Sequence, residues 1–351
     1  MRARVRAALP AITAAALYAL NVPLSKLLLV HVGPLMLAGL LYLGAGFGLL
    51  AVSACGAALG RTVVKEPLTR RELPYTAAMV VLDIAAPILM MLGLAVTSSA
   101  NAALLNNFEI AATTLIAFAL YREFISKRLL GAVVLITIAS MLLGFEGEGS
   151  FDFNVGSLLV LGACVCWGFE NNCTRCLSGK SSVEIVTIKG VFSGFGSLAV
   201  ALLSGESLPQ LRWAAAALAL GFASYGLSIN FYILAQKELG AAKTSAWYSV
   251  APFLGVLFSV VLLGERPGAL FYAALAVMAA AAVLMARDGA VRHTHEHAHA
   301  HTHAHCHDGV WHTHEHAHTH THEHTHGNGR EHAHGNDEMH VHAHTPKETA
   351  L

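Results

Sequence analysis

Long apolar stretches recur along most of this chain and limit the folds open to it. A helix that crosses the hydrocarbon core of a bilayer needs about 20 mostly apolar residues. Stretches of about that length alternate with short clusters of charged residues. We therefore expect ten membrane-spanning helices, over residues 9–30, 34–59, 73–95, 98–120, 129–146, 155–177, 184–204, 212–235, 243–263 and 268–286.

Composition agrees with an all-α polytopic membrane protein. The chain is 55% hydrophobic and 13% charged, whereas soluble domains carry about 25% charged residues. Inside lipid, helices satisfy their own backbone hydrogen bonds, which excludes irregular alternatives. The first segment, MRARVRAALPAITAAALYAL, is basic and then apolar, like a signal peptide. Because no cleavage site with soluble sequence follows it, we interpret it as an uncleaved first span.

Lys and Arg residues indicate the orientation of these helices, because cytoplasmic loops carry an excess of them. The loops on one side have only Arg212 and Arg266, and one of those loops, FEGEGSFDFN, is acidic. We therefore expect a multi-pass protein of the cytoplasmic membrane with both termini cytoplasmic. The basic residues on the cytoplasmic side are Arg2, Arg4, Arg6, Arg61, Lys65, Arg70, Arg71, Arg122, Lys127, Arg128, Lys180, Lys237, Arg287 and Arg292.

The chain also repeats itself in two halves. LYALNVPLSK at 17–26 aligns with CWGFENNCTR at 166–175, which matches Asn21 with Glu170. A second alignment, of 119–143 with 261–285, matches Glu123 with Glu265. Each half has five expected spans, and an odd number inverts the second half in the membrane. Inverted repeats are typical of alternating-access carriers, which bind substrate near mid-membrane where the repeats meet.

Several segments together resemble EamA-type carriers of the drug/metabolite transporter superfamily. They are LYREFISKR (120–128), WGFENNCTR (167–175), LGAAKTSAWYSVAPFLG (239–255) and LLGERPG (262–268). The resemblance covers residues 8–287 and implies ten helices in two five-helix repeats that transport small organic solutes. One departure is that Pro252 is matched by Ile110 in the first repeat. The expected organisation is a cytoplasmic N-terminus (1–8), repeats at 9–146 and 155–287, and a tail at 288–351.

Ionisable residues inside the expected spans indicate a polar interior. A charged side chain at mid-bilayer costs about 2.5–3.5 kcal/mol, yet Asp83, Glu109 and Glu170 lie well inside spans. Each is either a substrate or proton-coupling group, or a structural partner that holds helices together. The expected substrate cavity consists of Glu170, Asn171, Asn172, Asn106, Asn107, Glu109, Asn21, Asp83, Asn230 and Tyr225.

Other residues in the spans have structural explanations. Lys26, Lys189 and Tyr248 are expected at helix ends, where long or amphipathic side chains reach the membrane interface. The glycine pairs with GxxxG spacing at 44–48 and 190–194 are expected to let helices pack closely. A homodimer through such glycines stays open.

Three residues of the sixth span have the spacing of a helix face. Cys166, Glu170 and Cys173 are spaced i, i+4 and i+7. Two thiols and a carboxylate could hold Zn²⁺ or a similar ion. The alternative is that the cysteines fill space in the membrane interior without any chemistry.

The tail carries all but one of the 22 histidines, largely in His-x-His alternation. Imidazole suits Zn, Ni, Co or Cu, and with a reference pKa of about 6.5 much of it is neutral at cytoplasmic pH. The interleaved Thr, Ala and Glu offer little apolar surface, so we expect disorder before metal binds. The alternative is a repeat expansion whose metal affinity is unused. The expected ligands are His293, His295, His297, His299, His301, His303, His305, His307, His312, His314, His316, His318, His320, His322, His324 and His326.

The leading function hypothesis is a secondary transporter of small solutes or metabolites that works by alternating access. One alternative is a divalent transition-metal exporter (Ni, Co or Zn) supplied by the tail, and another is a metal-responsive membrane protein that transports nothing. We expect no enzyme and no required cofactor, since the chain shows neither a Ser–His spacing nor the ATP-binding GxxxxGK[ST] pattern. Expected partners are the lipid bilayer and a small-molecule or ion substrate, without nucleic acid. The substrate's identity, the direction of transport and the coupling ion do not follow from these patterns.

Overall fold

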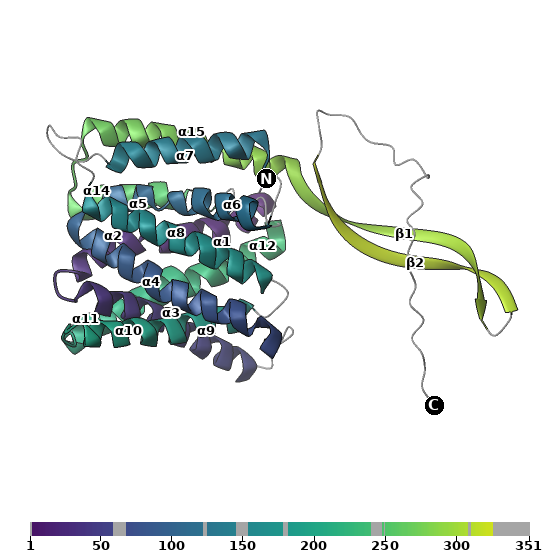
Figure 1. Ribbon diagram of the computed structural model, residues 1–351, viewed down its shortest axis with the longest axis horizontal. Coiled ribbons are helices and arrows are strands. Elements are labelled where there is room, and N and C mark those ends of the chain that lie inside the picture. Colours follow the sequence, from purple (N-terminus) through teal and green to yellow (C-terminus); the bar gives the residue numbers. More distant parts are fainter. Residues whose placement is uncertain are drawn as a thin grey trace. The chain divides into compact units, whose positions relative to one another are not determined.

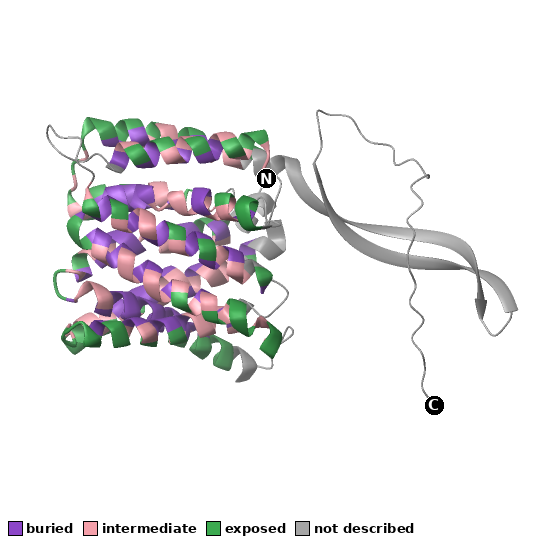
Figure 2. Ribbon diagram, viewed as in Figure 1, coloured by how far each residue is buried: buried purple, intermediate pink, exposed green. Residues whose placement is uncertain are grey.

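The computed structural model describes residues 2–58, 68–121, 125–144, 154–177, 182–239, 248, 250–307 and 310–325. It divides into two compact units, residues 1–290 and 291–351. The first unit is a bundle of helices that run along a common axis in stacked layers (Figure 1). Buried residues face the inside of this bundle and exposed residues cover its outer helices (Figure 2).

Each stretch expected to span the membrane contains helix. The first half comprises α1 (Arg2–Ala19), α2 (Asn21–Leu28), α3 (Pro34–Ala58), η1 (Arg70–Glu72), α4 (Leu73–Val96), α5 (Ser99–Leu105), α6 (Phe108–Tyr121) and α7 (Lys127–Gly144). The second half comprises α8 (Val155–Cys176), α9 (Ser182–Ile188), η2 (Lys189–Ser193), α10 (Gly194–Leu203), α11 (Leu211–Gly221), η3 (Phe222–Leu227), α12 (Ser228–Leu239), α14 (Ala251–Leu263) and α15 (Ala269–Val291).

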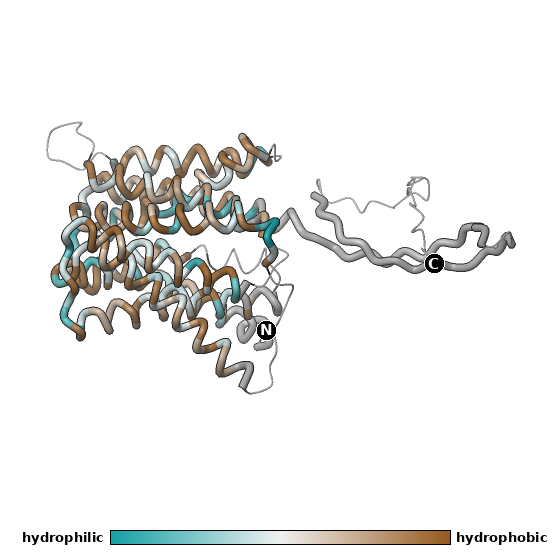
Figure 3. The backbone as a smooth tube through the Cα atoms, turned by 60° about the horizontal axis from the view of Figure 1, so that its bottom comes forward, coloured by the Kyte–Doolittle hydropathy of each residue, from teal (hydrophilic) through white to brown (hydrophobic). Residues whose placement is uncertain are grey.

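Length and apolar composition qualify six stretches of the described helices to cross a membrane. The shorter helices Ala251–Leu263 and Ala269–Met285 are apolar as well. Hydrophobic residues run along most helices, and hydrophilic ones gather toward the helix ends (Figure 3). A multi-pass helical membrane protein is therefore confirmed. The six stretches are Leu9–Leu28, Pro34–Cys55, Arg70–Val96, Ser99–Leu120, Glu184–Leu203 and Leu211–Tyr232.

Two of the expected spans are broken by identifiable residues. α1 and α2 are separated at Leu20, because Pro23 has no N–H to donate and its ring clashes with the carbonyl four residues earlier. α5 and α6 are separated at Asn106 and Asn107. The Asn107 side chain donates to the Leu104 carbonyl over 3.0 Å, and its backbone N–H donates to the same carbonyl over 3.2 Å. Such local side-chain hydrogen bonds compete with the regular helical pattern.

Close packing inside the bundle depends on glycines of α3 and η2. A Cβ atom added to Gly190 would lie 2.5 Å from the Cα of Gly46. One added to Gly44 would lie 2.1 Å from the carbonyl oxygen of Leu218, on α11. The backbones therefore touch at these positions, which only a residue without a side chain permits. The GxxxG glycines at 44–48 and 190–194 thus serve contacts within this chain, as the close-packing expectation stated.

The histidine-rich tail differs from the disorder that its composition predicts. In the second unit, β1 (Arg292–His307) pairs antiparallel with β2 (Val310–Thr325). The physical reason is periodicity. Successive residues of a strand alternate between its two faces, so a sequence of period two suits a strand even without an apolar core. The expectation of disorder rested on the lack of apolar surface to bury, whereas the His-x-His alternation of the sequence fits the observed strands.

Candidate functional site

A lysine and two carboxylates meet inside the bundle. Lys189 Nζ lies 2.8 Å from Glu170 Oε1 and 3.3 Å from Asp83 Oδ2. The contact to Glu170 is a hydrogen bond, whereas the one to Asp83 is an ion pair whose geometry leaves Asp83 Oδ2 without a hydrogen bond. Asp83 is fully buried, Glu170 is 2% exposed, and the Lys189 side chain is 21% exposed. We call these three residues the lysine cluster.

The lysine cluster depends on local helix geometry. Lys189 begins η2, a π-helical segment between α9 and α10. A π-turn inserts an extra residue into a helix and is frequent at functional sites. A second π-helical segment, η3, contains Tyr225. Lys189 and Tyr225, one from each π-helical segment, lie at the same part of the bundle.

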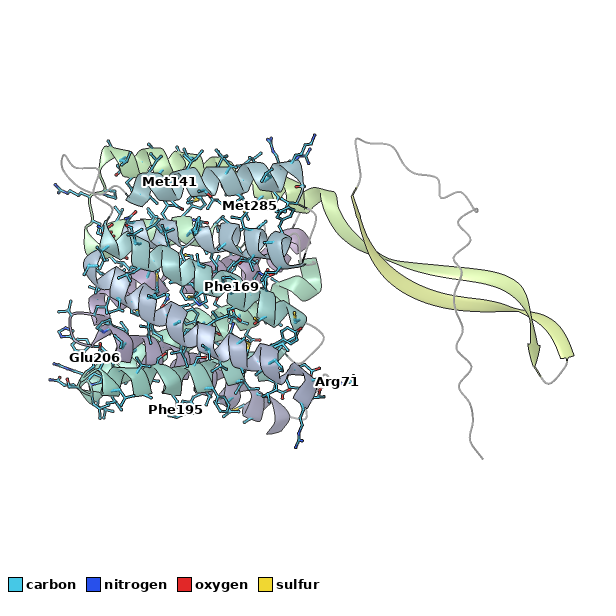
Figure 4. The ribbon with its side chains drawn as sticks, viewed as in Figure 1. Arg71, Met141, Phe169, Phe195, Glu206 and Met285 are labelled. Carbon is cyan, nitrogen blue, oxygen red and sulfur yellow. The ribbon has the colours of Figure 1, made fainter. Side chains whose placement is uncertain are left out.

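Further hydrogen bonds fix the two carboxylates. The Tyr42 hydroxyl donates to Asp83 Oδ1 over 3.0 Å and accepts from Trp167 Nε1 over 3.2 Å. The Thr174 hydroxyl donates to Glu170 Oε1. Buried carboxylates persist only when paired and hydrogen-bonded. The residue before Glu170, Phe169, is 41% exposed at the outside of α8 (Figure 4), so this helix turns its carboxylate inward and its ring outward.

A cavity of about 70 Å³ adjoins the lysine cluster, where α3, η2 and η3 approach one another. Its volume is enough for a few water molecules but not for a metabolite, so a larger ligand needs these helices to separate. The cavity is lined by Tyr42, Ala45, Val186, Lys189, Gly190, Tyr225 and Ile229.

Tyrosines connect this cavity to a second polar group. Tyr225 lies 5.6 Å from Tyr42 and 6.0 Å from Tyr18, ring centre to ring centre. The Tyr225 hydroxyl accepts from Asn21 Nδ2 over 2.7 Å, and the Tyr18 hydroxyl accepts from Asn106 Nδ2 over 3.0 Å. Aromatic rings with polar tips can offer both stacking and hydrogen bonding to a solute.

The second polar group is built on Glu109. Its Oε1 accepts from Asn171 Nδ2 over 2.7 Å, and Asn171 also donates to the Thr113 hydroxyl over 3.2 Å. These residues join α6 to α8. Glu109 therefore accepts a hydrogen bond from an amide, whereas Asp83 and Glu170 are paired with Lys189.

The expected cavity residues do not form one continuous site but fall into separate groups. Asp83 and Glu170 enter the lysine cluster, and the tyrosine and Glu109 groups take up Asn21, Tyr225, Asn106, Glu109 and Asn171. Asn172 donates to the carbonyls of Gly168 and Thr113, and Asn107 to that of Leu104, so both are bound to the backbone. Asn230 is half-buried on α12, next to the cavity residue Ile229.

Sequence reasoning missed Lys189, Tyr42 and Tyr18. Lys189 was expected at a helix end, which is wrong: it is surrounded by helix and bound to two buried acids. The cost of a charge inside an apolar span could have flagged it as it flagged the acids. Tyr248 was expected at the interface, but its ring packs against Tyr18 at 5.8 Å.

The thiols of α8 do not gather into a metal site. Cys173 packs with Met79, Leu177 and Ile185, while Glu170 is bound to Lys189. Among the described residues of the helical unit, no three His, Cys, Asp or Glu residues lie close enough to hold an ion together. The alternative expectation, that these cysteines fill space in the membrane interior, fits these surroundings.

Helix termini at one end of the bundle are capped by charged side chains. The Glu206 carboxylate accepts from the backbone N–H groups of Leu35 and Met36 at the start of α3. The Glu265 carboxylate accepts from Ser99 and Ala100 at the start of α5, both over 2.8 Å. Carboxylates at helix N-termini complement the helix dipole.

Lys26 makes the complementary contact. Its Nζ donates to the carbonyls of Leu94 and Thr97, over 2.5 and 2.7 Å, where α4 ends. A cation at a helix C-terminus is the favourable partner for the dipole. Lys26 therefore ties the end of α2 to the end of α4 instead of extending freely to water.

These features define a class: a multi-pass helical membrane protein whose charged side chains meet inside the bundle. The model of the EamA-like transporter family matches residues 5–145 and, a second time, residues 154–287. The chain therefore belongs to the EamA-like transporter family, whose members move small solutes across membranes.

Individual relatives agree with this assignment. An uncharacterized transporter of Methanothermobacter thermautotrophicus strain Delta H is 25% identical over 269 residues, which cover 72% of this chain and 78% of that protein. A solved structure described only as the crystal structure of a protein aligns with a TM-score of 0.57 at 20% identity, over 80% of this chain and 95% of that chain. The latter shows likeness of fold alone.

Proposed function

We propose that this protein is a secondary transporter that works by alternating access between two inverted five-helix halves. Two matches to one family model support a duplication. Helix packing supports its inversion: α4 of the first half packs on α8, and α12 of the second half packs on α1. Each contact joins the third span of one half to the first span of the other, as a two-fold relation between the halves requires.

The observation that carries the proposal is the lysine cluster. Asp83 comes from the first half, whereas Lys189 and Glu170 come from the second. A movement of one half against the other changes the distance between Asp83 and Lys189 and opens the adjoining cavity. Because the cluster holds two carboxylates and one ammonium group, it favours a solute with a positively charged group, such as an amine, that competes with Lys189.

Transport by purified protein tests this function. Proteoliposomes should take up a solute found by a growth screen of a deletion strain against amino acids, drugs and metals. Glu170→Gln keeps the shape of the side chain and removes the charge, so we expect uptake to fall at least about tenfold, which corresponds to 1.4 kcal/mol. Glu206→Gln, which removes the same charge at the start of α3 and outside the cluster and cavity, is the matched control and should retain uptake. Wild-type-like uptake by Glu170→Gln would contradict the proposed site.

We also propose that both termini lie in the cytoplasm and that the protein resides in the cytoplasmic membrane. α1 begins and α15 ends at the same end of the bundle (Figure 1). Arg71 and Glu206 lie at opposite ends (Figure 4). The end with Arg71 is rich in Lys and Arg, which favours its cytoplasmic placement.

The histidines of the tail support a second proposal, that the tail binds divalent metal ions such as Zn²⁺ or Ni²⁺. A metal exporter supplied by the tail is the narrower alternative. It predicts that a deletion strain becomes sensitive to Ni, Co or Zn, and that a chain lacking residues 293–345 restores less resistance than the full chain. Full protection by the shortened chain would exclude a role for the tail in export, and proteoliposomes that move no solute would favour a non-transporting metal-binding protein.

A further inference from the structure

The two strands of the tail place histidine opposite histidine. In the register of β1 and β2, every second pair of opposite residues is a pair of histidines, and there are seven such pairs. They run from His293–His324 at the open end to His305–His312 near the connection. Residues two apart in a strand share a face. All the paired histidines therefore belong to one face of the hairpin, and Thr, Ala and Glu occupy most of the other.

The spacing of the histidines changes at the connection between the strands, and the observed pairing requires that change. Neighbouring histidines within each strand are two residues apart, but His307 and His312 are five apart. Unbroken alternation through a two-residue turn would set every histidine opposite a different residue type. The strands are separated by Asp308-Gly309, a dipeptide strongly preferred in two-residue hairpin turns. Spacing and turn residues thus agree independently on the same pairing.

We propose that the hairpin is a ladder of metal sites in which two successive cross-strand histidine pairs hold one Zn²⁺ or similar ion. Directly opposite residues have Cβ atoms about 4.5–5.5 Å apart, and the next pair on the same face follows about 7 Å along the strand. Two pairs supply the four nitrogen ligands of a tetrahedral zinc site. This inference rests on the proposed metal binding by the tail and adds that strand pairing creates the sites.

Metal binding and hairpin formation are coupled in this arrangement. An isolated two-stranded hairpin is marginally stable in water, and a ligand set that exists only in the ordered chain turns binding energy into folding energy. The ion therefore stabilises the strand pair that holds it. Acid should reverse the process, because an imidazolium cannot bind metal, and imidazole titrates at a reference pKa of about 6.5.

Two variants test whether pairing matters apart from the number of histidines. Each carries six His→Asn substitutions, so their histidine content is equal. The pair-breaking variant changes six histidines of β2 and leaves only the His305–His312 pair. These six are His314, His316, His318, His320, His322 and His324. The pair-keeping variant changes His293, His295, His297, His320, His322 and His324 and leaves four pairs. Zn²⁺ competition with a chromophoric chelator measures affinity and stoichiometry in the full-length protein in detergent, and far-UV circular dichroism follows the strand pair.

We expect the wild-type protein to bind about three Zn²⁺ ions tightly and the pair-keeping variant about two, since each site needs four ligands. The pair-breaking variant should bind at least about tenfold more weakly, because its ligands lose the effective concentration that pairing gives, and should show no strand signal on zinc addition. Equal binding by the two variants would overturn the ladder and leave a flexible metal-binding tail. Absence of zinc binding by the wild-type protein would overturn both.

Discussion

At the scale of single residues, Lys189 decides the electrostatics of the bundle interior. Its ammonium group faces two carboxylates that are almost completely buried. Removal of one partner from a buried ion pair is strongly destabilising, because the remaining charge has no compensation. Replacement of all the charges by neutral groups of similar shape often costs little. Stability and transport can therefore be separated at this site.

Lys189→Met should lower the free energy of unfolding by about 3–5 kcal/mol, because Asp83 and Glu170 then lose their counter-charge. Adding Asp83→Asn and Glu170→Gln should restore most of that stability but no transport. Chemical or thermal unfolding in detergent, with uptake in proteoliposomes, measures both effects. An unchanged unfolding free energy for Lys189→Met would show that this ion pair is absent in the protein's membrane environment.

At the scale of the elements, η2 and α3 touch through their backbones. Gly190 follows directly after Lys189, so whatever separates these two helices also displaces the lysine. The contact of Gly190 with Gly46 leaves no room for a methyl group, which lies 2.5 Å from a backbone atom. The rigid positioning of the cluster therefore depends on residues that carry no charge.

Gly190→Ala should reduce transport at least about tenfold and destabilise the protein by about 1–3 kcal/mol, the usual cost of overpacking. Gly162→Ala is the control, because its added methyl group would meet Leu89 at an ordinary 3.6 Å. Uptake in proteoliposomes and the free energy of unfolding are measured for both alanine variants. If both alanine variants behave alike, close approach of η2 and α3 does not position the lysine.

At the scale of the whole molecule, the helical unit and the tail are separate compact units. Helices of the first unit end alternately at the Arg71 end and at the Glu206 end, and the tail follows α15. In the proposed topology, the basic residues at the Arg71 end place that end in the cytoplasm. In the proposed function, transport belongs to the first unit and metal binding to the second.

Cysteine labelling with a membrane-impermeant reagent tests the orientation. In intact cells, Leu208→Cys near Glu206, at a side chain that is 74% exposed, should react from outside, whereas Arg71→Cys should react only after permeabilisation. The experiment starts from a background in which the native cysteines are replaced. Reaction of Arg71→Cys in intact cells would reverse the proposed topology.

Sequence reasoning predicted the apolar helices, their approximate ends, the duplication and the acids inside the spans. These features follow from the length and hydropathy of each segment and from local breakers such as Pro23. It also placed Glu170 inward, because a carboxylate in an apolar span needs a partner. The identity of that partner did not follow, since Lys189 lies 19 residues away from Glu170 and more than 100 from Asp83.

Which polar groups meet follows from the packing of distant helices. Lys189 begins a π-helical segment, and hydropathy patterns do not indicate such a segment or the acids that Lys189 contacts. Packing also selected Tyr42 and Tyr18, which no local pattern separates from ordinary aromatic residues of a membrane helix. In the tail, alternation defined one histidine face for each strand, but only the register brought the two faces together. Local periodicity reports which side of an element a residue occupies, whereas its partners depend on contacts between distant segments.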